Sequence, residues 1–372
     1  MPDLSLVMLG AGTSSRFKMS AKKQWLRTGH TPLWLYATQN IMKNYAFAKI
    51  VIVCNKDEIE YMKLFNSEFI YVAGGDSRQD SLKNALSHVE SQGVLVSDVA
   101  RVCVPQDMLQ RVISEYGSAD IIVPYIKTQD TVVFKNETVN RDDIKLIQTP
   151  QLSNTNSLKN ALLHAKDFTD DSSAVKANSG AIKYVIGDKT ANKITYLEDI
   201  EIISKLEKPS ADIFIGNGYD VHQFEDGKKM VLCGVEIQYD RGLKAHSDGD
   251  VAIHALIDAL LGASGAGDIG ELFPDNNPKY KHVDSKKLLK EVVLFLHNTG
   301  FQIVNCDLTI ISESPKISPY KKLMRETIAN ILQIKPLHVN IKATTTETLG
   351  FIGRGEGIGV SAISSLKYYD WK

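Results

Sequence analysis

Two segments of the sequence combine histidines and carboxylates at spacings that suit a metal site. Asp220 and His222 follow an apolar run, and their side chains would project together because alternate residues of a strand share one face. Asp250, His254 and Asp258 recur every four residues in an otherwise apolar stretch, which predicts a polar stripe along a helix. An Asp220, His222 and His254 set with one open position indicates a catalytic divalent metal, zinc in particular. A histidine on an apolar helix is more often a hydrogen-bonded core residue, so His254 alone would not indicate a metal.

A glycine-containing loop near the N-terminus predicts a second site, for phosphate. The first apolar run leads into Gly10 and Gly12, where small residues let backbone N–H groups approach a phosphate closely. Arg16, Lys22 and Lys23 follow closely enough to surround the phosphates of a nucleotide on this loop. The loop lacks the third glycine of a dinucleotide fingerprint and the Gly-Lys-Ser/Thr of a P-loop. A tight strand-to-helix turn with solvated cations is the alternative interpretation.

The elements around the glycine loop indicate a doubly wound α/β fold. Short apolar runs predict strands at residues 4–9, 49–54, 69–73, 99–104 and 121–123. Amphipathic segments lie between them, such as the helix predicted at residues 77–89 behind an Asp76 or Ser77 cap. This alternation favours a mostly parallel sheet that holds ligands beyond the carboxyl ends of its strands. Residues 131–147 interrupt the pattern and predict an inserted hairpin arm.

The elements around the metal motif differ in their order and indicate a separate α+β domain. Strands are predicted at residues 213–215, 303–311, 339–343 and 359–365, and helices at residues 251–261, 285–297 and 321–332. The polar stretch around Pro209 predicts the joint. We therefore expect one domain over residues 1–206, a linker over residues 207–211 and a second domain over residues 212–372.

Composition limits the classes of partner and the compartment. The 372 residues include 43 Lys and Arg and 44 Asp and Glu, a net charge of −1, so no general positive field exists to bind nucleic acid or an anionic membrane. Charged residues interrupt every long apolar run, so we expect no export signal and no membrane span. The cysteines form no C-x-x-C pair, which favours reduced thiols and a cytoplasmic location; they are Cys54, Cys103, Cys233 and Cys306.

Residues 1–206 resemble the 2-C-methyl-D-erythritol 4-phosphate cytidylyltransferases, a family with a Rossmann-like nucleotidyltransferase domain and a β-arm. The motifs that align in order are LGAGTSSRF with KKQ, GGDSRQDS (74–81), SDVAR (97–101), QDT (129–131), TPQ (149–151), TDDSSA (169–174) and NKIT (192–195). The resemblance implies transfer of a cytidylyl group from CTP to methylerythritol phosphate with release of pyrophosphate. It places Arg16 and Lys23 on the triphosphate, Lys193 beside the transferring phosphate, and Asp98 in the active site as an acid.

The same resemblance assigns the substrates of the first site. It implies that the nucleotide is bound by Gly10, Gly12, Gly74, Asp76 and Ser81, and methylerythritol phosphate by Arg141, Thr149 and Thr169. Arg141 would reach from the arm into the site of a second subunit, so a dimer is implied. The sequence departs from the family pattern at Lys22, Ser97 and Val102, positions where the family has proline, histidine and proline.

Residues 212–372 resemble the 2-C-methyl-D-erythritol 2,4-cyclodiphosphate synthases. The motifs are GYDVHQF (218–224), LKAHSDGDVAIHALIDALLGASGAGDIGELFPD (243–275), SPK (314–316) and IKATTTETLGFIGRGEGI (341–358). The resemblance implies that Asp220, His222 and His254 bind zinc and that Glu347 holds a second divalent ion. The implied reaction closes 4-diphosphocytidyl-methylerythritol 2-phosphate into a cyclic diphosphate and expels CMP.

The remaining positions of this motif set complete the implied second site. His246, Lys316 and Thr345 would assist the reaction. The implied substrate-binding set is Asp220, His222, His246, Ser247, Asp268, Ile269, Gly270, Asp275, Ala343, Thr344, Thr345, Thr346, Glu347, Phe351 and Arg354. Lys316, Ala343 and Thr344 would come from a neighbouring subunit, because the family is trimeric. Phe351 and Arg354 would face the three-fold axis.

Together the two resemblances predict a bifunctional enzyme of the methylerythritol phosphate pathway, with Zn²⁺ in the C-terminal site and Mg²⁺ or Mn²⁺ in both reactions. The expected partners are small molecules and further copies of the chain, with dimer and trimer contacts combined most simply in a hexamer. One alternative is that only the C-terminal half is catalytic and the N-terminal half is an assembly or nucleotide-sensing module. Another is a nucleotidyltransferase for a different sugar phosphate.

Overall fold

The structure, a computed structural model, describes residues 3–43, 45–163, 168–201, 206–245, 247–274, 280 and 283–371. The chain divides into two compact units. One runs to Lys208 and includes Trp371, and the other spans Pro209–Asp370. No helix in the described ranges is both long enough and apolar enough to span a bilayer.

A mixed sheet forms the centre of the first unit. Within the described residues its eight strands are β1 (Leu4–Leu9), β4 (Ile50–Cys54), β5 (Ile70–Ala73), β6 (Gly93–Asp98), β7 (Ile121–Lys127), β10 (Lys145–Ile147), β11 (Gln151–Asn154) and β12 (Ile182–Ile186). The strand order is β10-β7-β11-β6-β1-β4-β5, and β12 pairs with β7. Strands β6, β1, β4 and β5 are parallel, which agrees with the predicted doubly wound fold.

Strand β1 marks the point where the order of the sheet reverses. The chain passes from β1 to β4 and β5 on one side and then to β6 on the other, where Leu9 pairs with Asp98. Such a reversal leaves a crevice beyond the carboxyl ends of the two central strands. The glycine loop begins at this crevice, directly after β1.

The prediction of a strand at residues 99–104 is wrong, because the strand of this region lies at residues 93–98. Strand β6 ends at Asp98, and the following residues form a turn in which the Val99 N–H donates to the Leu9 carbonyl at 3.1 Å. Val99 and Val102 are buried, so the turn carries the same apolar composition as a strand. Two consecutive apolar runs cannot be told apart by composition when both are buried.

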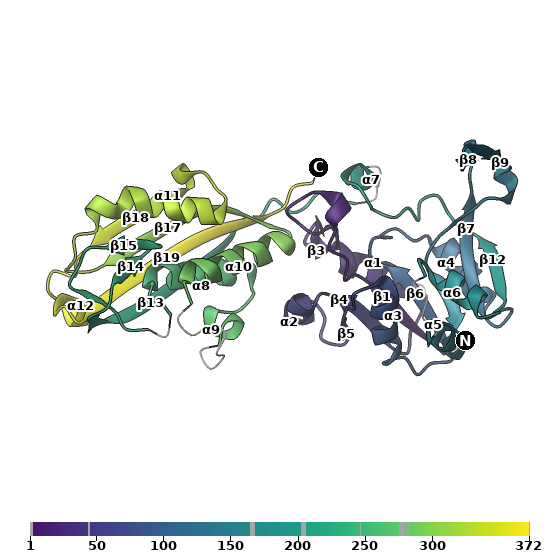
Figure 1. Cartoon of the computed structure of the whole chain (residues 1–372), viewed down its shortest axis with the longest axis horizontal. Helices are drawn as coiled ribbons and strands as arrows, with labels where there is room; N and C mark the ends of the chain where they lie inside the picture. The colour runs from purple at the N-terminus through teal and green to yellow at the C-terminus, as the bar shows by residue number, and fades with distance from the viewer. Residues whose placement is uncertain are drawn as a thin grey trace. The chain divides into compact units, whose positions relative to one another are not determined.

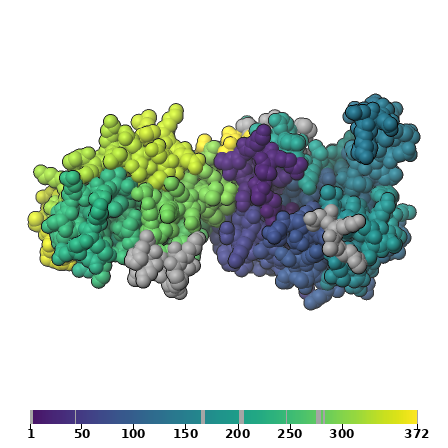
Figure 2. Space-filling model, in the orientation of Figure 1, coloured from purple at the N-terminus to yellow at the C-terminus, as the bar shows by residue number. Residues whose placement is uncertain are grey.

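Helices cover the sheet, and its arm is a separate hairpin. The helices are α1 (Leu33–Met42), α2 (Ile59–Lys63), α3 (Arg78–Leu86), α4 (Gln106–Ser114), α5 (Thr155–Leu163), α6 (Asp171–Ala177) and α7 (Leu197–Glu201). The predicted cap of α3 is confirmed, because the Ser77 hydroxyl accepts the Asp80 N–H at 3.0 Å. Strands β8 (Val132–Phe134) and β9 (Glu137–Val139) form the expected arm, which projects from the first unit in Figure 2.

The second unit contains a five-stranded mixed sheet among its described residues. Helices pack against this sheet, as Figure 1 shows. Its described strands, in sheet order, are β16 (Arg241–Leu243), β13 (Phe214–Asp226), β19 (Gly357–Tyr368), β17 (Phe301–Ile311) and β18 (Val339–Thr344). The helices are α8 (Val251–Ser264), α9 (Ile269–Leu272), α10 (Ser285–Asn298), α11 (Lys321–Leu332) and α12 (Gly350–Gly353), and a small ribbon pairs β14 (Met230–Leu232) with β15 (Val235–Ile237). These elements confirm the predicted α+β composition.

Candidate active sites

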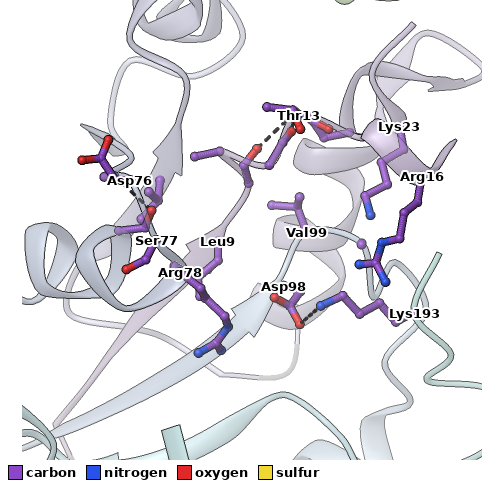
Figure 3. A pocket seen from close by; sticks show the side chains of 18 residues that line it. Leu9, Thr13, Arg16, Lys23, Asp76, Ser77, Arg78, Asp98, Val99 and Lys193 are labelled. Atoms are coloured by element: carbon purple, nitrogen blue, oxygen red, sulfur yellow. Dashed lines mark hydrogen bonds and ion pairs between the residues drawn. The ribbon is translucent and has the colours of Figure 1, made fainter. Parts of the chain in front are cut away.

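The first candidate site is a cavity of about 470 Å³ at the crevice beside β1 and β6 (Figure 3). The residues that line it are Leu9, Gly10, Ala11, Gly12, Thr13, Arg16, Lys23, Gln24, Val53, Gly75, Asp76, Ser77, Arg78, Ser81, Asp98, Val99, Ala100 and Lys193. The structure thus brings together eight residues predicted for this site: Gly10, Gly12, Arg16, Lys23, Asp76, Ser81, Asp98 and Lys193.

A buried glutamine holds the glycine loop in shape. The Gln24 side-chain NH₂ donates to the carbonyl of Gly10 at 3.1 Å and to that of Gly12 at 3.2 Å. The Ser14 hydroxyl donates to the side-chain carbonyl oxygen of Gln24 at 3.0 Å. Gly10 also lies so close to β4 that a Cβ atom would come within 3.0 Å of the Val53 carbonyl oxygen. The loop is therefore fixed by contacts and leaves its backbone open to the cavity.

Three cations from two distant segments of the chain line this cavity. Arg16 and Lys23 follow the glycine loop, and Lys193 lies on the same side of the cavity, below Arg16 in Figure 3. The Lys23 ammonium donates to the Ile194 carbonyl at 3.0 Å, and the Lys193 ammonium lies 3.0 Å from the Asp98 carboxylate. The cluster can neutralise a polyphosphate, because hydrogen bonds between cations and phosphate oxygens are short and strong.

Lys22 does not join the cluster, so its predicted contact with the phosphates is wrong. Its ammonium lies 2.5 Å from the carboxylate of Glu58, which is buried and also accepts the Trp25 indole N–H at 2.8 Å. Lys22 and Lys23 are adjacent, and their side chains leave the backbone in different directions. The buried Glu58 carboxylate pairs with Lys22, and of these two lysines only Lys23 lines the cavity. The spacing of the two lysines in the sequence could not show this difference.

The charges in the cavity shift one another's pKa values. Burial lowers the pKa of Lys23 below its usual value, and the positive charges of Lys193 and Arg16 lower it further. Burial would raise the pKa of Asp98, but the positive charges of Lys193 and Arg78 outweigh it, so the pKa of Asp98 lies below its usual value. Asp98 is therefore an anion in contact with the Lys193 ammonium.

A second cavity, of about 360 Å³, shares Arg78, Asp98 and Lys193 with the first. Predicted residues Thr149 and Thr169 line it. The Thr149 hydroxyl donates to Asp98 at 3.2 Å and accepts from the Arg101 guanidinium at 2.8 Å. The first unit thus has two adjoining cavities, and Lys193 and Asp98 line both of them.

Two predicted residues lie elsewhere, and several lining residues were not predicted. Gly74 is not among the lining residues: its N–H donates to the Cys54 carbonyl at 2.9 Å, and its neighbour Gly75 lines the cavity instead. Arg141 is exposed on the part of the arm that follows β9 and donates to the Gln129 carbonyl at 3.2 Å. The lining residues missed by sequence analysis include Gln24, Gly75, Arg78 and Arg101, all of which lie within the quoted motifs.

The second candidate site is the predicted triad of Asp220, His222 and His254. One potential ligand atom from each residue lies within 4.8 Å of the others. The Asp220 carboxylate is 3.1 Å from Nε2 of His222 and 3.3 Å from Nδ1 of His254. Atoms that bind zinc at about 2.0–2.2 Å in a tetrahedron lie roughly 3.3 Å apart, so the donors and their spacing fit this ion.

The close packing of β13 on α8 brings these three residues together. Asp220 and His222 lie on β13, and His254 lies on α8. A Cβ atom at Gly216 or Gly218 would come within 2.0 Å of a carbonyl oxygen of α8, so only glycine permits this approach. The two glycines of the GNGYD segment are the sequence signal for this contact.

Hydrogen bonds orient the metal-facing groups. Nδ1 of His222 lies 3.1 Å from the Gly249 carbonyl, which leaves Nε2 to face Asp220. Burial would raise the pKa of Asp220, but the neighbouring imidazoles of His222 and His254 hold it well below its usual value. The group is thus prepared as an anion flanked by two imidazoles.

The predicted stripe along α8 does not act as a unit. Asp250 is the N-cap of α8, and its buried carboxylate accepts the backbone N–H groups of Cys233, Gly234 and Ile253. Asp258 accepts the Ile269 N–H at 2.8 Å. Within the described residues only His254 of this stripe joins the metal triad.

The loop after β18 carries the predicted second-ion residue. Glu347 is exposed, and its carboxylate accepts from the Thr345 hydroxyl at 3.1 Å. Glu347 and Thr348 both have positive φ angles, of 52° and 62°, which are uncommon for residues other than glycine. The carboxylate of Glu313, near Lys316, accepts the Thr346 and Thr348 N–H groups and holds this loop.

The other predicted residues of the second unit lie on three segments. Ser247 contacts His254, whereas Asp268, Ile269 and Gly270 form the start of α9. Ala343 and Thr344 end β18, with Thr346 on the loop beyond. Phe351 lies on α12, and Arg354 forms a 2.6 Å ion pair with Glu356. His246 and Asp275 lie outside the described residues.

Comparison with known proteins matches both units. Residues 4–206 match the family described as 2-C-methyl-D-erythritol 4-phosphate cytidylyltransferase, and residues 213–367 match the YgbB family. A protein of Campylobacter fetus subsp. fetus named bifunctional enzyme IspD/IspF is 56% identical over 373 residues, covering 100% of this chain and 99% of its own. Its namesake in a Nitratiruptor species is 53% identical over 372 residues, with coverages of 100% and 99%.

A solved structure agrees over the same length. The bifunctional IspDF from Campylobacter jejuni has a TM-score of 0.88 and 48% identity, and the match covers 99% of each chain. The chain therefore belongs to the family of bifunctional IspD/IspF enzymes, which join a 2-C-methyl-D-erythritol 4-phosphate cytidylyltransferase to a cyclodiphosphate synthase.

Proposed function

We propose that the cluster of Arg16, Lys23 and Lys193 carries cytidylyl transfer and that the Asp220, His222 and His254 triad carries cyclisation. The first reaction moves CMP from CTP to 2-C-methyl-D-erythritol 4-phosphate. The second closes 4-diphosphocytidyl-2-C-methyl-D-erythritol 2-phosphate into the 2,4-cyclodiphosphate. The observation that supports this assignment is the convergence of three cations, from two segments far apart in the sequence, on one cavity.

In the first reaction, CTP lies on the glycine loop with its cytidine near Asp76 and Ser81. Methylerythritol phosphate occupies the adjoining cavity near Arg101, Thr149 and Thr169. A 4-phosphate oxygen attacks the α-phosphorus in line, the bond to the β-phosphate oxygen breaks, and pyrophosphate leaves. Arg16, Lys23 and Lys193 position the phosphates and neutralise their charge. Mg²⁺ or Mn²⁺ bound to the triphosphate would add further neutralisation.

In the second reaction the substrate supplies its own nucleophile. An oxygen of the 2-phosphate attacks the β-phosphorus, and the bond to the CMP oxygen breaks. Asp220, His222 and His254 would hold Zn²⁺, which when bound supplies a positive centre that polarises and orients a phosphate. Glu347, with Thr345 beside it, would hold a second divalent ion. Lys316 donates to the CMP phosphate, and Ala343 and Thr344 frame the cytidine of a neighbouring subunit's substrate.

Assembly into a homo-oligomer is part of this proposal. Ile215, Tyr219 and Ile363 of the central sheet are 70%, 54% and 47% exposed, which supports a trimer contact on this face. Val133 and Phe134 of the arm are also exposed, which supports its exchange between paired subunits. Dimer and trimer contacts together would generate a hexamer. We propose a cytoplasmic location on the basis of the buried thiols of Cys54, Cys233 and Cys306.

Two variants of the full-length enzyme test the separation of the activities. Lys193→Ala removes one charged hydrogen-bond donor, which contributes about 1.5–3 kcal/mol, so pyrophosphate release should fall by roughly 10- to 150-fold while cyclisation is unchanged. Asp220→Asn should abolish cyclisation and leave pyrophosphate release unchanged. Exposed Lys189 provides the control, because Lys189→Ala removes a nearby lysine that lines neither cavity.

Two outcomes of the same assays would contradict the proposal. A wild-type rate of pyrophosphate release from Lys193→Ala would exclude this lysine from the reaction. A wild-type enzyme that cyclises its substrate but releases no pyrophosphate from CTP and methylerythritol phosphate would favour an assembly role for the first unit.

A further inference from the structure

Both ring nitrogens of His254 have defined neighbours. Nδ1 faces the Asp220 carboxylate at 3.3 Å, on the side where the three donors converge. Nε2, on the far side of the ring, lies 3.1 Å from the hydroxyl oxygen of Ser285 and 3.2 Å from that of Ser247. A neutral imidazole carries one proton, so these neighbours determine which nitrogen is free to bind a metal.

The carboxylate of Asp248 determines the direction of these hydrogen bonds. It lies 2.5 Å from the Ser285 hydroxyl and also accepts the backbone N–H groups of Ser285 at 3.2 Å and Asp250 at 3.3 Å. A carboxylate that already accepts two N–H groups is an acceptor, so the Ser285 hydroxyl donates its proton to Asp248. The Ser285 oxygen is then an acceptor towards His254. Nε2 must carry the imidazole proton, and Nδ1 keeps its lone pair.

The position of Ser285 makes this chain of hydrogen bonds rigid. Ser285 is fully buried and is the first residue of α10, whereas His254 lies on α8 and Asp248 on the loop before α8. The N-cap side chain of Asp284 accepts the Lys286 N–H at 2.9 Å and fixes this end of α10. Rotation of Ser285 away from His254 would leave a buried hydroxyl without these partners, which is unfavourable.

We propose that Asp248 and Ser285 form a relay that positions His254 and selects its metal-binding tautomer. The inference rests on the proposed metal site and adds two residues that touch neither metal nor substrate. His222 needs no such side chains, because the Gly249 carbonyl performs the same task from the backbone. Because the partners of His254 are side chains, substitution can remove them, whereas the backbone partner of His222 would remain.

Zinc affinity of the full-length enzyme, measured by competition with a chelator, tests the relay without reference to catalysis. Loss of an outer-shell partner of a metal-binding histidine typically weakens metal affinity by about 10- to 100-fold, and we expect this loss in Ser285→Ala. The absorption spectrum of the Co²⁺-loaded variant should change, because the imidazole is no longer held in one orientation. Ser264→Ala is the matched control, since it removes a buried hydroxyl at the other end of α8 and should bind zinc as the wild type does.

A second variant separates tautomer selection from simple contact. In Asp248→Ala the Ser285 hydroxyl remains but loses its acceptor, so it can donate to Nε2 and favour the tautomer that protonates Nδ1. Zinc affinity should again fall by about 10- to 100-fold. Wild-type affinity in either Asp248→Ala or Ser285→Ala would overturn the relay, as would an equal loss in Ser264→Ala. A wild-type enzyme that binds no zinc would instead overturn the proposed metal site itself.

Discussion

At the residue scale, the positive charge of the first site depends on the protonation of Lys23, which lies close to other cations. Its ammonium lies among the positive charges of Lys193 and Arg16, and burial together with these charges lowers its pKa. Such a cluster is unfavourable without an anion and becomes favourable when a triphosphate binds. The free enzyme therefore holds a site that is most receptive while Lys23 is protonated.

This pKa predicts the alkaline limb of the cytidylyltransferase. As pH rises through the folded-state pKa of Lys23, which lies below the ordinary lysine value, its charge is lost and kcat/KM for CTP should fall. In Lys23→Arg the charge persists, because the arginine pKa exceeds about 12, so this limb should move to higher pH even if the maximal rate drops. The measurement is kcat/KM against pH, which reports the free enzyme.

The control for this experiment is Lys23→Met, which has no charge at any pH and should show low activity with no Lys23-dependent limb. An identical alkaline midpoint in Lys23→Arg and the wild type would show that another group produces the limb.

At the scale of elements, the second site depends on one strand lying directly on one helix. Asp220 and His222 reach His254 only because β13 approaches α8 at two glycines. A larger residue would force the strand away from the helix and separate the ligands by the same displacement. Metal binding and stability of the second unit are thus coupled through backbone packing.

Substitution of Gly218 by alanine tests this coupling. A Cβ atom would come within 2.0 Å of the Ala255 carbonyl oxygen, so we expect a loss of about 1–3 kcal/mol in the free energy of unfolding of this unit. Zinc affinity should fall by about tenfold or more, because the ligands on β13 shift relative to His254. Urea unfolding and chelator competition measure the two effects.

Gly262 of α8 supplies the matched control. A Cβ atom there meets nothing within 4 Å, and alanine in a helix should stabilise the unit by about 0.5–1 kcal/mol. A Gly218→Ala enzyme with wild-type stability and zinc affinity would show that β13 and α8 tolerate a wider separation.

At the scale of the whole molecule, the first unit includes a residue from the far end of the chain. Trp371 is only 3% exposed, and its indole N–H donates to the Arg27 carbonyl at 2.7 Å. The first compact unit therefore consists of residues up to Lys208 together with Trp371. A fragment that ends near Pro209 would lack this side chain.

We expect Trp371→Ala to destabilise the first unit selectively. Removal of a buried tryptophan side chain costs about 3–5 kcal/mol in the free energy of unfolding, and in a unit of this size the midpoint temperature should drop by about 6–20 °C. Residual pyrophosphate release and cyclisation after graded heating report the two units separately. Pyrophosphate release should be lost at the lower temperature, with cyclisation unchanged.

Trp371→Phe keeps an aromatic ring without the N–H and should show a smaller loss. If Trp371→Ala shifts both activities equally, or neither, the assignment of Trp371 to the first unit does not describe the enzyme in solution.

Features that depend on neighbouring residues could be predicted from the sequence. The Ser77 cap and α3, the hairpin arm, and the shared face of Asp220 and His222 follow from hydrogen bonding and periodicity within one element. The residues that form the cation cluster and the metal triad could also be named from the sequence, because they lie in motifs that resemble those of known families.

The tertiary structure alone decided which similar residues share a site. It separated Lys22 from Lys23, paired Asp250 and Asp258 with backbone N–H groups, and placed Ser285 beside His254. Each outcome depends on buried partners contributed by other elements, such as Glu58 or α10. A buried charge or hydroxyl needs a hydrogen-bonding partner, and this partner can come from any element that the fold brings close. The spacing of residues in the sequence does not show which distant residues will be close in space.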